Sequence, residues 1–293
     1  MGRTGGVSED GRLVRIDDCS LWVVERGPGD GRPLILLHGG PGLDHHEFAD
    51  YLDPLTDDGH RLLLVDLRAN GRSERTPPQT WTLERMAQDV IMLALALKLE
   101  RYAVLGHSFG AFVALQNAVD YPGQAARTIV SGGVASGRDL DGVGAALEAF
   151  EPVALREQVL GAWNREATAT TEEDVASLMH DQWPFHFSDP LDPRIEEYER
   201  RSAGWVFAPE VLRHAATASY GGIEVQDRLV DVPQPVLVLA GRHDRVCTVD
   251  ASTRMAALLP DAELHVFEES AHMMFVEQPE EYLQVVRAFL ARP

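Results

Sequence analysis

This chain of 293 residues has few cysteines, few basic residues and no long hydrophobic run. Its two cysteines, Cys19 and Cys247, are too few for a disulfide framework or a thiolate zinc site. No apolar stretch approaches the roughly 20 residues that span a bilayer, and the polar, glycine-rich segment 1–10 is unlike a secretion signal. The 26 basic residues against 46 acidic ones give a net charge of −20, which disfavours nucleic acid or an anionic membrane as a partner. We therefore expect a soluble, cytoplasmic protein.

Short apolar runs alternate with amphipathic segments along most of the chain. Residues 34–37, 62–65 and 102–105 are continuous apolar runs, which is typical of strands buried on both faces. Between them, Thr82 is placed to cap a helix whose apolar residues follow the 3.6-residue period through Leu97, and a second helix is predicted over 109–119. Strands are again expected at 235–240 and 263–267, with helices at 249–259 and 279–290. This alternation predicts an α/β fold with a mostly parallel central sheet and helices on both faces.

The middle of the chain breaks this pattern. From residue 135 to about 224 apolar residues thin out, while acidic and aromatic residues accumulate, among them Trp163, Trp183 and Trp205. We interpret this stretch as short helices, with the aromatics packing it against the rest of the protein. The predicted organisation is a core in two parts, 1–134 and 225–293, with a helical cap insertion at 135–224.

Residues 106–110, Gly-His-Ser-Phe-Gly, carry the strongest chemical signal. They lie where a predicted buried strand turns into a helix, the context in which a strained turn exposes a nucleophilic serine. Both glycines are needed there because strand and helix backbones approach closely. The alternative, a glycine-rich turn with a serine helix cap, does not account for this context, so Ser108 is the predicted nucleophile.

A serine needs a base and a group that orients the base. His272 follows the last predicted strand, and Asp244 follows the strand before it, so both belong at the edge of the sheet that presents Ser108. In isolation Asp244 would be a turn carboxylate and His272 a helix cap, but the chain order Ser, Asp, His fits a catalytic triad. Asp250 and Glu268 are the alternative acids.

Residues 38–42, His-Gly-Gly-Pro-Gly, directly follow another buried strand. Acyl transfer requires two backbone N–H groups aimed at the oxyanion. Phe109, which follows the nucleophile, can supply one, and Gly40 is the best placed for the second. The alternative is a tight turn that merely uses glycines.

Together these motifs, with residues 66–73 (Asp-Leu-Arg-Ala-Asn-Gly-Arg-Ser), resemble α/β-hydrolases of the proline iminopeptidase type over residues 12–134 and 225–293. Ala69 departs from the glycine usual in that branch. The resemblance implies the α/β-hydrolase fold and an enzyme that removes an N-terminal residue, often proline, and holds the free amine with cap glutamates. Residues 163–166, Trp-Asn-Arg-Glu, approximately match one such cap motif, which puts Glu166 forward. With Trp163 and with Gly39 of the loop 38–42, Glu166 makes up the substrate-binding residues that the resemblance implies.

The second cap glutamate has no clear counterpart. The candidates are Glu196, Glu197, Glu199 and Glu224, each of which is more simply a solvated charge. The resemblance therefore favours an aminopeptidase acting on a small molecule or short peptide, with a carboxylesterase or lactonase as the alternative and a non-enzymatic binding protein as the least favoured reading.

No cofactor or metal is predicted. The chain lacks a G-x-G-x-x-G or P-loop pattern, and His180 and His186 lack partners at metal-binding spacing. His45 and His46 are adjacent, so on a helix we expect their side chains to point apart.

Overall fold

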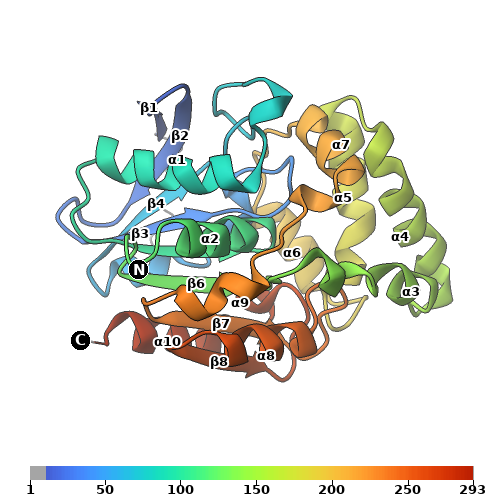
Figure 1. The fold of residues 1–293 in the computed structure, drawn as a ribbon. Coiled ribbons are helices and arrows are strands. Elements are labelled where there is room, and N and C mark those ends of the chain that lie inside the picture. The colour runs from blue at the N-terminus through green and yellow to red at the C-terminus, as the bar shows by residue number, and fades with distance from the viewer. Residues whose placement is uncertain (1–10, 293) are drawn as a thin grey trace, which may run out of the picture.

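The computed structural model describes residues 11–292; segment 1–10, which we judged unlike a secretion signal, lies outside the described residues. Its centre is an eight-stranded sheet in the order β1-β2-β4-β3-β5-β6-β7-β8 (Figure 1). β1 and β2 are antiparallel to their neighbours and every other pairing is parallel. The strands are β1 Gly11–Arg15, β2 Ser20–Arg26, β3 Arg32–Leu37, β4 His60–Val65, β5 Ala103–His107, β6 Arg127–Ser131, β7 Val236–Gly241 and β8 Ala262–Phe267.

Alternate residues of each central strand enter different hydrophobic clusters. In β3, Ile35 and Leu37 join one cluster, while Leu34 and Leu36 join the other. The first cluster includes buried residues of the helices α1 (Leu83–Ala96), α2 (Phe109–Asp120) and α8 (Val249–Leu258), and the second includes those of α10 (Pro279–Leu290). The unbroken apolar runs thus reflect burial on both faces of the sheet, as the sequence predicted.

The helices begin and end close to the predicted positions. Thr82 caps α1, its hydroxyl accepting from the backbone N–H of Arg85, as the sequence predicted. The helices are α1 Leu83–Ala96, α2 Phe109–Asp120, α3 Val143–Glu148, α4 Val153–Arg165, α5 Glu172–His186, α6 Arg194–Arg201, α7 Pro209–Thr217, α8 Val249–Leu258, α9 Met274–Glu277 and α10 Pro279–Leu290. Within residues 11–292, no helix has both the length and the apolar character needed to cross a membrane.

Helices α3 to α7 lie between β6 and β7 in the chain and gather beyond one end of the sheet (Figure 1). The two ends of this insertion are hydrogen-bonded to each other. The N–H of Gly137 donates to the carbonyl of Ile223 at 2.7 Å, and the N–H of Val225 donates to that of Ala135 at 2.9 Å. The insertion therefore leaves the core and returns to it at one place, and we propose residues 135–224 as its extent.

Candidate active site

Ser108 lies in the sharp turn between β5 and α2. Its φ of 52° and ψ of −119° are rare for a residue with a side chain, so the surrounding structure must hold the turn. A Cβ on Gly106 would come 2.0 Å from the carbonyl oxygen of Gly110, and one on Gly110 would come 2.1 Å from that of Leu37. Only glycine fits at either position, for the reason that the sequence indicated.

Asp244 and His272 lie together on neighbouring loops after β7 and β8. Asp244 Oδ2 lies 2.7 Å from His272 Nδ1, and Oδ1 accepts from the backbone N–H groups of Val246 and Cys247 at 2.8 and 2.9 Å. Because a carboxylate accepts, Nδ1 carries the proton and Nε2 is left free to act as a base. Burial lowers the pKa of His272, but the charge and hydrogen bond of Asp244, together with the charges of Glu47 and Glu277, outweigh it and raise that pKa overall.

The alternative acids lie elsewhere. Asp250 is in the first turn of α8, and Glu268 pairs with Arg242 at 2.7 Å on the surface. Neither hydrogen-bonds His272 in the described part of the chain, so the structure brings Asp244 alone of the three to the histidine.

The loop after β3 lies beside Ser108. A Cβ on Gly39 would come 2.9 Å from that of Ser108, so the loop and the serine are in close contact. His38 donates through Nδ1 to the carbonyl of Gly39 at 2.7 Å and accepts at Nε2 from the N–H of Leu67 at 3.0 Å, which fixes the loop. Gly40, with φ of 106°, takes a conformation that favours glycine.

Ala69, where the resembling branch carries glycine, also has a positive φ, of 62°. Ala69 adopts this left-handed conformation despite its side chain. The replacement of glycine by alanine therefore leaves the backbone turn at residue 69 unchanged. The neighbouring Asn70 accepts from the N–H of Gly42 at 2.8 Å, which ties this segment to the loop after β3.

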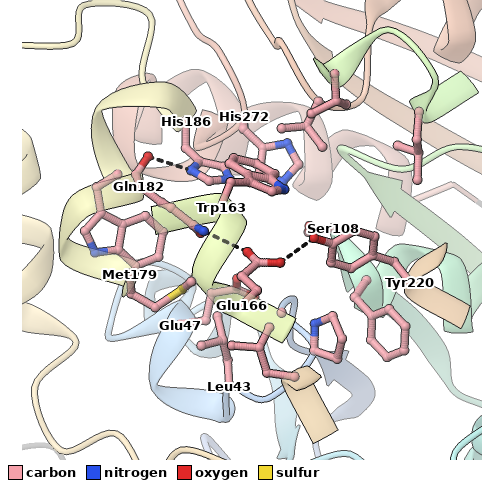
Figure 2. Close-up of a pocket in the computed structure, with 18 of the residues that line it drawn as sticks. Leu43, Glu47, Ser108, Trp163, Glu166, Met179, Gln182, His186, Tyr220 and His272 are labelled. Carbon is pink, nitrogen blue, oxygen red and sulfur yellow. Dashed lines mark hydrogen bonds between the residues drawn. The ribbon is translucent and has the colours of Figure 1, made fainter. Parts of the chain in front are cut away.

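A cavity of about 300 Å³ joins these elements. Ser108, Phe109, Gly40 and His272 line it on the core side, and the insertion supplies the other walls (Figure 2). Its walls are largely apolar, and the apolar side chains that line it include Leu43, Phe112, Leu140, Leu147, Met179 and Leu212. Such a cavity suits a small substrate with one reacting polar group.

Glu166 lies in this cavity, as the resemblance implied, and is only 4% exposed. Gln182 donates to its Oε1 at 2.7 Å and the Tyr220 hydroxyl donates to Oε2 (Figure 2). Burial raises the pKa of Glu166, against the lowering effect of both hydrogen bonds. Trp163 also lines the cavity. Gln182 and Tyr220 were not predicted, because nothing in their local sequence marks them.

Glu47 is a second carboxyl group in the cavity that the sequence did not reveal. It accepts from the backbone N–H of Gly39 at 2.5 Å, and burial raises its pKa to about 8. The one signal was its position, shortly after the glycine-rich loop.

The four other cap acids do not line the cavity. Glu197 lies 3.7 Å from Arg201, Glu199 bonds His180 at 2.7 Å, and Glu224 accepts from Ser136 at 2.8 Å. Glu196 lies in the first turn of α6. None of them is placed to replace Glu166.

His45 and His46 correct one prediction. Their rings lie 4.3 Å apart, so the expectation that they point apart is wrong. The segment is a short 3-10 helix, and each ring is held by a different carboxylate: His45 by Asp66 at 2.5 Å and His46 by Asp44 at 2.9 Å. With Asp44 they form a possible ligand group, in which the Nδ1 atom of each imidazole is already held by a carboxylate.

Comparisons with known proteins agree with this geometry. A model of the alpha/beta hydrolase fold family matches residues 32–279. The chain belongs to this family. A proline iminopeptidase of Heyndrickxia coagulans is 28% identical over 280 residues, covering 89% of this chain and 91% of the relative. A 2-hydroxy-6-oxononadienedioate/2-hydroxy-6-oxononatrienedioate hydrolase of Klebsiella pneumoniae is 26% identical, covering 98% and 94%.

Among solved structures, a proline iminopeptidase of Mycobacterium smegmatis is similar with a TM-score of 0.74 and 26% identity, covering 96% of this chain and 97% of that one. The predicted fold class and the resemblance to the iminopeptidase branch are therefore confirmed, and the protein is a hydrolase.

Proposed function

We propose that this hydrolase works through an acyl-enzyme on Ser108. His272 takes the serine proton, the serine oxygen attacks an acyl carbon, and the N–H groups of Gly40 and Phe109 stabilise the oxyanion. Asp244 keeps the proton on Nδ1 and stabilises the imidazolium. His272 then protonates the leaving group, and water activated by the same histidine releases the acyl group.

We infer further that the substrate is an N-terminal aminoacyl amide, in a small molecule or short peptide. The observation that carries this is Glu166, a buried carboxyl in the same cavity as Ser108 whose hydrogen-bond partners, Gln182 and Tyr220, are both neutral. A substrate ammonium would supply the positive charge that this carboxylate otherwise lacks.

An esterase or lactonase is the alternative, and the apolar walls of the cavity favour it. Leu140, Leu147 and Leu212 would suit a neutral acyl chain as well as a proline ring.

We also propose a cytoplasmic location for the protein, which is inferred from the composition of the chain.

The test compares L-proline p-nitroanilide with p-nitrophenyl acetate and butyrate. Ser108→Ala is expected to lower kcat on all three by about 10⁴-fold or more while the protein stays folded. Glu166→Gln is expected to raise KM for the anilide about tenfold or more, because an ion pair is lost, and to leave ester turnover within about twofold. Glu199→Gln, outside the cavity, is the control.

The outcomes separate the two activities. Anilide turnover that disappears when the proline nitrogen is acylated supports the aminopeptidase. Ester turnover with no anilide cleavage moves the esterase to first place, and full activity of Ser108→Ala would overturn the mechanism itself.

A further inference from the structure

His186, the last residue of α5, lies between two rings of the site. Its imidazole stacks on Trp163, with centroids 5.7 Å apart and an interplanar angle of 14°, and lies 5.3 Å from the ring of His272. It lines the same cavity as Ser108 (Figure 2). The acyl-enzyme mechanism gives this side chain no role, although it lies beside the base that must protonate the leaving group.

The proton of His186 is fixed at Nδ1. This nitrogen lies 3.1 Å from the carbonyl oxygen of Gln182, and because a carbonyl can only accept, Nδ1 donates (Figure 2). Burial lowers the pKa of His186 most, and the neighbouring His272 and Arg245 lower it further. Asp244 acts in the opposite direction, and the resulting pKa is about 3. The ring is therefore neutral, and Nε2 carries a lone pair.

That lone pair is available to a ligand. Within residues 11–292 the Nε2 of His186 has no hydrogen-bond partner, yet it is not enclosed, in contrast to the unpaired Nε2 of His107. A neutral imidazole nitrogen in this state can accept a hydrogen bond and cannot give one. Whatever lies against it must therefore supply an N–H or O–H.

The leaving group of an amide supplies such a hydrogen. In the tetrahedral intermediate the scissile nitrogen carries one hydrogen and one lone pair. His272 gives its proton to that lone pair, the C–N bond breaks with its electrons going to nitrogen, and the C=O bond re-forms on the acyl-enzyme as the amine leaves. The original N–H points away from His272 and needs its own acceptor, whereas the leaving oxygen of an ester has no hydrogen.

We propose that His186 Nε2 accepts a hydrogen bond from the scissile N–H and so directs this enzyme towards amides over esters of the same acyl group. The inference rests on the proposed aminopeptidase function and names a determinant of its bond specificity. The backbone reinforces the placement, since the N–H of His272 donates to the carbonyl of His186 at 2.9 Å. Side-chain substitutions at position 186 leave this backbone hydrogen bond in place.

The experiment measures kcat/KM for L-proline p-nitroanilide and L-proline benzyl ester, which share one acyl group. His186→Phe keeps a flat ring against Trp163 and removes the acceptor. It is expected to lower kcat/KM for the anilide about tenfold or more and to change that for the ester less than twofold. His186→Gln, whose amide oxygen can take the place of Nε2, is expected to recover part of the anilide rate. His180→Gln, on the exposed side of the same helix, is the control.

Two results would overturn the inference: an equal loss on both substrates, which indicates packing alone, or an unchanged anilide rate in His186→Phe. The proposed aminopeptidase function is tested separately, by the activity of the wild type on the two substrates. If the wild type hydrolyses the ester and not the anilide, the aminopeptidase proposal falls, and the amide-directing role of His186 falls with it.

Discussion

At the scale of single residues, the proposed base is supported chiefly by one carboxylate. His272 is buried, and burial alone would keep its imidazole neutral. Asp244, with additional contributions from Glu47 and Glu277, outweighs burial and raises the pKa of His272 above its ordinary value of 6.5. The proposed base is active when neutral, so wild-type activity is expected to rise with pH through a midpoint above 6.5.

Asp244→Asn is expected to change both the rate and this profile. The neutral amide no longer holds the proton on Nδ1, so kcat should fall about 10⁴-fold. The acid limb of the residual kcat/KM should move to lower pH, because burial then dominates the pKa of His272. A pH profile of anilide or ester hydrolysis checks this.

Asp250→Asn and Glu268→Gln, at the two alternative acids, serve as controls and should keep the wild-type rate and profile. If either of them lost activity and Asp244→Asn did not, the assignment of the acid would be wrong.

At the scale of elements, the backbones are closely packed at the turn from β5 to α2. Gly106→Ala and Gly110→Ala would each push a methyl group to about 2 Å from a backbone carbonyl oxygen. Neither backbone can move without displacing a central strand, so each change is expected to lower the free energy of unfolding by about 3 kcal/mol or more. Urea denaturation followed by circular dichroism measures this.

Gly161→Ala, in the middle of α4, is the matched control. The nearest atom that its added Cβ meets is the Arg165 guanidinium at 3.7 Å, an ordinary contact. It should raise stability by up to about 1 kcal/mol, because alanine is the better helix former. Losses of similar size at all three glycines would contradict the close-approach argument.

The core elements could be predicted from the sequence because local pattern and tertiary burial agree there. Leu34–Leu37 is apolar throughout because its alternate residues enter the two clusters on either face of the sheet. Ser108, Asp244 and His272 could be placed on one edge because parallel strands end together. The positions of these residues follow from the strands that precede them.

The walls of the cavity could not be predicted in the same way. Gln182, His186 and Tyr220 reach it only through the way the insertion folds over the core, and Glu47 reaches it through a loop that turns back under Gly39. Their local sequence resembles that of any polar helix or turn. Glu166 was identified by resemblance to a family motif, and no periodicity marks it.

At the scale of the whole molecule, the many acidic residues of this chain include several that are buried. Burial raises the pKa of several enclosed carboxyl groups: Glu47, Glu166, Glu277 and Asp89. The folded protein therefore holds protons that the unfolded chain releases near pH 4 to 5. Because the unfolded state binds fewer protons above that range, these groups make stability fall as pH rises.

Glu47→Gln isolates the largest such effect, since the pKa of this group is raised from 4.5 to about 8. The amide oxygen can still accept from the N–H of Gly39, while the ionisation disappears. At pH 5 the variant and the wild type should differ little. Between pH 5 and 8 the variant should gain stability relative to the wild type by up to about 1.4 kcal/mol per pH unit.

Urea unfolding at pH 5, 6.5 and 8 measures this difference. Glu268→Gln is the control. The exposed Arg242 lowers the pKa of Glu268, so removing this carboxyl group should not change how stability depends on pH between pH 5 and 8. If Glu47→Gln and the wild type lost stability in parallel up to pH 8, Glu47 would already be ionised in the folded protein. Its carboxylate would then be a fixed negative charge beside the loop that presents Gly40, and the proposed oxyanion site would have to work against it.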